Sequence, residues 1–179
     1  AEFSWLEFQK RKDNKLILIG DQMSGKKPTI MKMAYQLNKG EIPAFNGYKM
    51  IKLDCCDLLK AELDEEYIEL VMQDFYDFID GKDYIIFVDN LYVVRDDTVI
   101  AKTLWHMLWP LFLDESYYVI SALTASTADI FNYNLKFLKK ITLINCVEPK
   151  SEEEKDALKE SIFLLTFYHG VYVTEEMIG

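Results

Sequence analysis

The segment 15–30 constrains the fold most, because an apolar run ends there in a glycine-rich turn that leads into a helix-like stretch. Residues 15–19 are typical of a strand buried on both faces. Gly20 and Gly25 follow, Lys26 comes directly after them, and Pro28 suits the first turn of a helix. Such a strand–loop–helix unit directs backbone N–H groups and a helix N-terminus at phosphate. The alternative is that the glycines end a strand and the lysines solvate a helix start.

Strand-like and helix-like apolar periods alternate along the rest of the chain. This alternation predicts an α/β domain in three layers, with a mostly parallel five-stranded sheet flanked by helices. Besides 15–19, we expect strands over 49–54, 84–88, 116–123 and 139–146. We expect helices over about 28–40, 63–79, 101–113 and 151–168. The third is expected to stop around Pro110, and the last is opened by a capping box at Ser151 and Glu154.

Two of these helices carry enough apolar residues to predict how they pack. In the helix 63–79, Tyr67 is expected to face the core as part of one apolar face, made of Leu63, Tyr67, Leu70, Val71, Phe75, Phe78 and Ile79. The segment 104–113 contains Trp105, His106 and Trp109 and is expected to be a buried helix, with a protein-contact patch as the alternative. His106 has no cysteine or carboxylate at ligand spacing.

Charge and cysteine content exclude some classes of partner and compartment. Half of the 179 residues are hydrophobic, enough for the core of one domain. A net charge of −10 argues against nucleic acid and anionic membranes as partners, and no apolar run is long enough to span a bilayer. Cys55, Cys56 and Cys146 form neither a disulfide framework nor a metal spacing. They favour reduced thiols in a cytosol-like compartment or organelle matrix.

A second candidate site element is the pair Asp89 and Asn90, which directly follows the apolar strand 84–88. An Asp at the end of a strand beside a phosphate loop is the group that orders magnesium in ATPases. The next residue is commonly a Glu that polarises the attacking water. The amide of Asn90 cannot accept a proton, so this assistance is missing. The alternative for Asp89 is that it merely caps the following turn.

Six partial matches in chain order give the sequence a resemblance to the Clp/Hsp100 unfoldases, of the ClpB and ClpC type. It resembles the large α/β subdomain of their first AAA+ module, which implies the three-layer P-loop NTPase (AAA+) fold. The matching segments are "RKDNKLILIGD", "NKGEIPAFNGYKMIKLDCCDLL", "YIIFVDNLYVV", "ISALTAST", "VEPKSEEEKDAL" and "YHGVYVT".

The resemblance also implies a division of the chain. It gives a helical lead-in over 1–14, the large subdomain over 15–170, and the start of a lid subdomain over 171–179. Within the large subdomain it implies a degenerate Walker A loop at 20–27 and a degenerate Walker B strand at 84–90. The sensor-1 residue would lie near Thr124, at the end of the strand "ISAL".

Several residues depart from the family pattern where chemistry would need them. Lys27 stands in place of the magnesium-binding Ser or Thr of Walker A, and Asn90 in place of the Walker B Glu. Lys139 and Lys140 stand where the family has paired arginines, and lysine lacks the planar fork that engages phosphate. The mobile pore loop is missing between the second strand and the next helix. One alternative is that Lys27 mimics the metal's charge and holds nucleotide without magnesium.

These departures predict a degenerate Clp/Hsp100-like AAA+ domain that is a pseudo-ATPase in protein quality control, or a regulatory or scaffolding subunit. One form of this hypothesis includes ATP or ADP bound without hydrolysis and without magnesium. We expect no catalytic residue and no metal ligand. Its partners would be other protein subunits, among them an active Clp/Hsp100 relative. The alternatives are a divergent active ATPase module of an unfoldase and a pure protein-interaction domain. Candidate nucleotide-binding residues are Gly20, Gly25, Lys26, Lys27, Asp89, Asn90 and Thr124, and candidate interface residues are Lys139 and Lys140.

Overall fold

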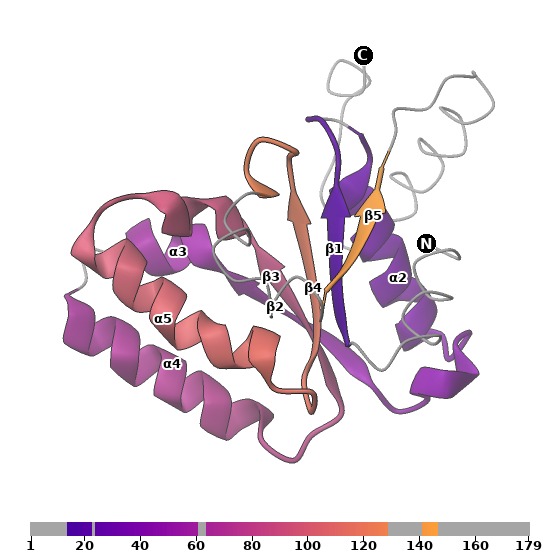
Figure 1. The fold of residues 1–179 in the computed structure, drawn as a ribbon. Helices are drawn as coiled ribbons and strands as arrows, with labels where there is room; N and C mark the ends of the chain where they lie inside the picture. Colours follow the sequence, from indigo (N-terminus) through magenta and orange to yellow (C-terminus); the bar gives the residue numbers. More distant parts are fainter. Residues whose placement is uncertain (1–13, 23, 61–63, 129–140, 147–179) are drawn as a thin grey trace.

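A computed structural model describes residues 14–22, 24–60, 64–128 and 141–146, and these form a parallel five-stranded sheet with helices on both faces (Figure 1). The strand order is β2-β3-β4-β1-β5, and each neighbouring pair is parallel. The five expected strands and the α/β class are therefore confirmed. The strands are β1 (Lys15–Ile19), β2 (Lys49–Asp54), β3 (Tyr84–Asp89), β4 (Tyr118–Leu123) and β5 (Thr142–Asn145).

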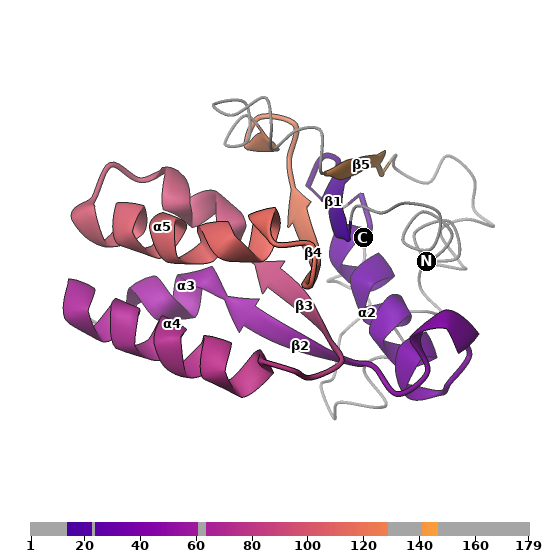
Figure 2. The same ribbon diagram turned by 60° about the horizontal axis from the view of Figure 1, so that its bottom comes forward.

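The sheet separates the hydrophobic core into two parts, and helices cover the part on each face. Alternate residues of a strand point to opposite faces, so Ile17 packs on one side of β1 while Leu16 and Leu18 pack on the other. Figures 1 and 2 show α4 and α5 on one side of the sheet and α2 on the other. The helical elements are α2 (Lys26–Asn38), η1 (Pro43–Phe45), α3 (Cys55–Lys60), α4 (Glu65–Ile79), η2 (Leu91–Arg95) and α5 (Val99–Leu113).

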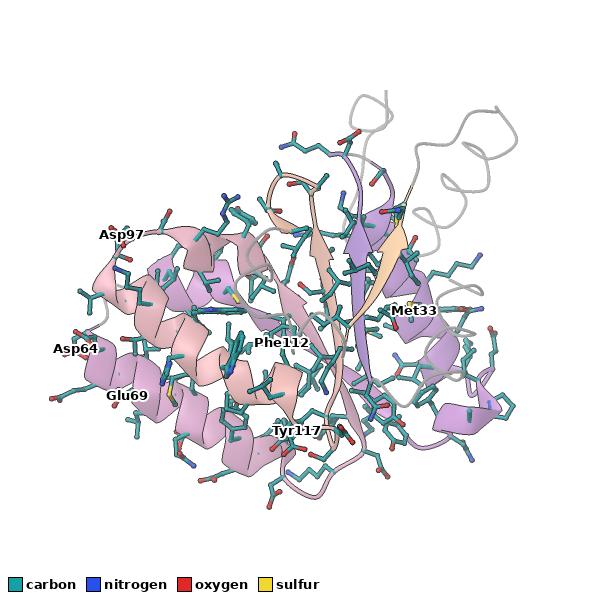
Figure 3. The ribbon with its side chains drawn as sticks, viewed as in Figure 1. Met33, Asp64, Glu69, Asp97, Phe112 and Tyr117 are labelled. Atoms are coloured by element: carbon teal, nitrogen blue, oxygen red, sulfur yellow. The ribbon has the colours of Figure 1, made fainter. Side chains whose placement is uncertain are left out.

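The aromatic helix α5 belongs to the core, as expected. Leu104, Leu108, Leu111 and Phe112 are fully buried. In Figure 3, Phe112 lies between α5 and the sheet, whereas Met33 lies on α2 beyond the opposite face. The expected end at Pro110 is wrong, because the helix continues to Leu113. Pro110 has no N–H to donate within the helix, but its carbonyl accepts a hydrogen bond from the Asp114 N–H at 2.9 Å, so the last turn is closed.

The expected buried face of α4 is wrong for three of its residues. Tyr67, Leu70 and Phe78 are 47%, 59% and 50% exposed, and Ile68 and Met72 are buried in their place. Ile79, which belongs to the expected face, is buried as predicted. The helix carries two overlapping apolar stripes, and packing against α5 selects the one that contains Ile68 and Met72. Part of the other stripe packs locally, since the Phe78 ring stacks on Tyr84 at 5.5 Å between ring centres.

The short helix α3 was not expected, because the sequence favoured a direct passage from β2 into the next long helix. Cys55 begins α3 at the end of β2 and is fully buried. Residues 61–63 lie outside the described residues, so the missing pore loop stays a prediction. Four further predictions also concern residues outside the described ranges and stay predictions. They are the lead-in 1–14 (of which only residue 14 is described), the interface residues Lys139 and Lys140, the helix 151–168 and the start of the lid at 171–179. Within the described ranges, no helix has both the length and the hydropathy needed to cross a bilayer.

Candidate functional site

The predicted site elements meet at one edge of the sheet because they follow the carboxyl ends of parallel strands. The loop 20–25 follows β1, the pair Asp89 and Asn90 ends β3, and Thr124 follows β4, which lies between those two strands. Ligands of open α/β sheets bind at this edge. The structure therefore brings together the segments that sequence analysis assigned to one site.

Both motif glycines have a structural reason in the loop between β1 and α2. A Cβ atom on Gly20 would lie 2.4 Å from the Cys146 carbonyl oxygen and 2.4 Å from Ser24 Oγ, so a side chain does not fit there. Gly25 has φ of 75° and is the N-cap of α2. This left-handed conformation favours glycine. The loop therefore depends on its backbone, and a larger residue at either position would disturb it.

The Lys26 ammonium lies inside this loop. It donates hydrogen bonds to the Gly20 carbonyl at 2.8 Å, to Ser24 Oγ at 3.0 Å and to the Asp21 carbonyl. In α2, which is described along its whole length, the first turn carries two lysines and no acidic residue. Cations at a helix N-terminus oppose the helix dipole, so this end of α2 is strongly positive and suits an anion such as phosphate.

Lys27 reaches across to the end of β3 and forms an ion pair with Asp89. Its Nζ lies 2.8 Å from Asp89 Oδ1 and 3.0 Å from Oδ2, and 3.3 Å from Asn90 Oδ1. The Asp89 side chain is only 6% exposed, whereas that of Lys27 is 53% exposed. Since a buried carboxylate needs a partner, Lys27 neutralises Asp89 from the solvent side. Lys27, which the family resemblance puts at the position of a magnesium-binding hydroxyl, thus places a cation on the Asp89 carboxylate.

A second ion pair lies beside the first and was missed by sequence analysis. Lys52 Nζ is 3.1 Å from Asp54 Oδ2 and 4.0 Å from Asp89 Oδ2. Asp54 Oδ1 also accepts hydrogen bonds from Asn90 Nδ2 at 2.8 Å and from the Cys56 N–H at 3.0 Å. Burial alone would raise the pKa of Asp54, but the hydrogen bonds from Asn90 and Lys52 outweigh it and lower the pKa to about 2.

The strand register contained the signal for this second pair. Asp54 and Asp89 are the last residues of two adjacent parallel strands and are paired with each other in the sheet. Lys52 precedes Asp54 by two residues, so both side chains point to the same face. Both strands can be identified from the sequence, but the alignment of their ends follows only from the register of the sheet.

Asn90 is held by hydrogen bonds of its side-chain oxygen, its side-chain nitrogen and its backbone N–H. Its side chain donates to Asp54 and accepts from Lys27, and its own N–H donates to Asp89 Oδ1 at 2.8 Å. Its φ of 55° is left-handed, a conformation that asparagine tolerates better than most residues. An amide fixed in this way positions the two carboxylates but cannot take a proton from water.

The donor set around Asp89 does not fit magnesium. Mg²⁺ requires a near-octahedral shell of oxygen atoms. Here both oxygens of Asp89 face the Lys27 ammonium, and a second ammonium, that of Lys52, stands 4.0 Å away. Among the described residues, no group of three or more His, Cys, Asp or Glu side chains could hold a metal ion. A divalent cation at Asp89 would have to displace Lys27 and face Lys52.

Thr124 lies at the same edge, and its side chain closes a local turn. Its hydroxyl is 2.9 Å from both Ser126 Oγ and Thr127 Oγ1, and its N–H donates to Thr127 Oγ1 at 3.0 Å. Arg95, which sequence analysis did not single out, donates to the Ser126 carbonyl at 2.8 Å and ties this turn to η2. The hydroxyl of Thr124 would have to leave these partners to contact a ligand, so its role as sensor stays a prediction.

Comparison with known proteins bears on the fold. No protein-family model matches the chain, and no curated protein matches it. Among solved structures, it is similar to a closed-state Hsp104 with ATPγS and FITC casein, with TM-score 0.73 and 20% identity over 94% of this chain. It is also similar to an S. cerevisiae Hsp104–casein complex in an extended conformation (TM-score 0.68, 18% identity, 94% of this chain). An S. cerevisiae Hsp104–ADP complex gives TM-score 0.68 and 19% identity over 98% of this chain.

The match concerns one part of those larger proteins. This chain covers 30%, 30% and 31% of the three Hsp104 chains. At such low identity the likeness concerns the arrangement of helices and strands, and the parallel sheet with a glycine-containing loop between β1 and α2 agrees with it. The chain therefore shares the fold of the matched part of Hsp104, the AAA+ P-loop NTPase fold, and the likeness shows the fold alone.

Proposed function

We propose that this Clp/Hsp100-like AAA+ domain is a pseudo-ATPase that binds ATP or ADP through its phosphate loop and does not hydrolyse it. The observation that carries the proposal is the ion pair between Lys27 and Asp89, 2.8 Å apart, where hydrolysis would need a magnesium ion. The loop supports the binding part of the proposal, since Gly20, Gly25 and Lys26 keep the geometry and charge that suit phosphate.

Hydrolysis of ATP in this fold needs a metal ion, a polarised water and a cation near the γ-phosphate. The positive charge of the Lys27 ammonium disfavours binding of the metal ion. Asn90 opposes the second requirement, because its amide is engaged by Asp54 and Lys27 and has no basic oxygen comparable to a carboxylate. Since each loss acts on the same transition state, restoring one group alone would leave the others missing.

A pseudo-ATPase of this kind would act through binding to other proteins. We propose a regulatory or scaffolding role in protein quality control, beside other protein subunits such as an active Clp/Hsp100 relative. Lys139 and Lys140 remain the proposed contact residues for a neighbouring subunit. The three cysteines are free thiols, which supports a reducing compartment as its location.

The test is phosphate release by the chain at saturating ATP and excess magnesium. We expect a rate indistinguishable from buffer, because water activation and metal binding are both compromised. Lys26→Ala is the control, since any release that survives in this variant comes from a contaminating enzyme. Turnover by the unmodified chain that disappears in Lys26→Ala would contradict the proposal. The double variant Lys27→Thr with Asn90→Glu asks whether those two groups are sufficient to restore activity.

A further inference from the structure

We propose that the Lys27 ammonium takes the place of the magnesium ion, so that the phosphate loop binds a nucleoside polyphosphate that carries no metal. The inference rests on the proposed binding of nucleotide and goes beyond it by naming the ionic form of the ligand. It starts from the mismatch between the residues around Asp89 and magnesium.

The position of Lys27 makes it available to phosphate. It follows Lys26 directly in the first turn of α2, so both ammonium groups start from the positive end of the same helix. Its side chain is 53% exposed and approaches Asp89 from the solvent side. A phosphate chain that enters the loop from solvent therefore meets two adjacent lysines, of which Lys27 has the freedom to turn toward it.

The neighbouring groups allow Lys27 to turn without leaving Asp89 isolated. Asp89 Oδ1 keeps the hydrogen bond from the Asn90 N–H at 2.8 Å. Lys52 Nζ stands 4.0 Å from Asp89 Oδ2 and is held near it by Asp54 at 3.1 Å. A small movement of the exposed Lys52 side chain would pair it with Asp89. The second ion pair thus provides a replacement partner for the buried carboxylate.

The charge balance favours phosphate without metal. The ammonium groups of Lys27 and Lys52 offset the carboxylates of Asp54 and Asp89, and Lys26 adds a positive charge at the loop that forms no ion pair with any carboxylate of the described residues. A magnesium-bound nucleotide would bring a divalent cation toward Lys27, and like charges a few ångströms apart repel each other. A metal-free phosphate chain carries more negative charge and meets no such repulsion. Magnesium and the protein therefore compete for the same phosphate oxygens.

The test is a calorimetric titration of the chain with ATP, once in EDTA and once in excess magnesium chloride. We expect the apparent affinity to be about tenfold or more weaker with magnesium, within the usual range for coupling between two ligands. Inorganic triphosphate is titrated in parallel. Weaker binding of triphosphate than of ATP supports recognition of a nucleotide, and equal binding would overturn that part of the inference.

Variants at Lys27 assign the effect to its charge. Lys27→Met should abolish the metal-free binding, and Lys27→Arg should retain it because the cation is kept. Lys27→Thr restores the hydroxyl, and magnesium should now strengthen binding or leave it unchanged. The matched control is Lys32→Met, an exposed lysine on the same helix, which should bind as the original chain does. Thermal midpoints of all variants show whether each is folded, and the Arg variant keeps the test decisive if the Met variant is not.

Two results would overturn the inference: magnesium strengthening the binding of ATP to the original chain, or unchanged metal-free binding in folded Lys27→Met. Absence of ATP binding in both buffers would overturn it as well. These failures differ from that of the pseudo-ATPase proposal, which is decided by phosphate release. A chain that binds magnesium–ATP tightly without turnover would contradict the inference and leave the absence of hydrolysis intact.

Discussion

The two halves of the candidate site are built from different parts of the polypeptide. One half, the backbone half, consists mainly of main-chain atoms, with the close approach at Gly20, the left-handed Gly25 and the start of α2. The other half, the side-chain half, consists of side chains at the ends of β2 and β3 and in the first turn of α2, namely Lys27, Lys52, Asp54, Asp89 and Asn90.

This difference predicts that the two halves respond differently to substitution. Gly20 lies against the carbonyl of Cys146, so a substitution there disturbs the packing of the loop on the end of β5 and acts on folding itself. The residues of the side-chain half can be exchanged without changing the topology, provided that each buried charge keeps a partner. Substitutions in the loop are therefore expected to cost more stability than substitutions among these side chains.

The largest expected effect tests the backbone half. Gly20→Ala should lower the free energy of unfolding by about 3 kcal/mol, because its Cβ would collide with a backbone carbonyl that cannot rotate away. Gly81→Ala is the matched control, since Gly81 has φ of 64° but open space around it and should cost about 1 kcal/mol. Urea unfolding of both variants measures the difference. Equal losses would show that the close approach at Gly20 carries no special weight.

The next effect tests whether the loop binds phosphate independently of the side-chain half. If the loop still grips phosphate, ATP at a hundredfold excess over its dissociation constant stabilises the chain by about 2.7 kcal/mol. Lys26→Ala should remove this gain, because Lys26 supplies the charge inside the loop. Thermal unfolding with and without ATP, in EDTA, measures it. An unchanged shift in the variant would mean that ATP binds elsewhere.

The smallest effect probes the side-chain half through pH. The pKa of Asp54 falls from 3.8 to about 2 on folding, because hydrogen bonds from Asn90 and Lys52 outweigh the effect of burial. Its contribution to stability is therefore present above pH 3.8 and is lost as the pH falls through 2. We expect about 1 kcal/mol after allowance for solvent screening.

Unfolding of the Asp54→Asn variant between pH 5 and pH 2, set against the original chain, measures this contribution. The curve of the variant should be flatter. Asp57→Asn is the control, because Asp57 pairs with Lys60 on the surface, where both side chains are largely exposed. If both variants change the pH dependence equally, the network around Asp54 contributes no more than a surface ion pair.

The strands and the loop could be predicted from sequence because each depends on local pattern. Continuous apolar runs mark buried parallel strands, and the spacing of Gly20, Gly25 and Lys26 marks the turn into α2. The side-chain partners could not be predicted in the same way. The pairing of Lys27 with Asp89 joins residues 62 positions apart, and the place of Lys52 and Asp54 depends on the register between β2 and β3.

Helix packing failed to follow from sequence for a related reason. α4 carries apolar residues on more than one side, so periodicity alone could not tell whether Tyr67 or its neighbour Ile68 faces the core. The neighbour that decides it, α5, is distant in sequence. The left-handed backbone of Asn90 was likewise invisible, because its hydrogen bonds go to residues from three different elements.

The contact between Gly20 and Cys146 has a mechanical consequence. The Cys146 N–H donates to the Ile19 carbonyl at 2.6 Å, and its own carbonyl stands where a side chain on Gly20 would be. With no side chain between them to absorb a displacement, the loop and the carboxyl end of β5 must shift together. A displacement of the polypeptide at Cys146 is therefore expected to move the turn that precedes α2.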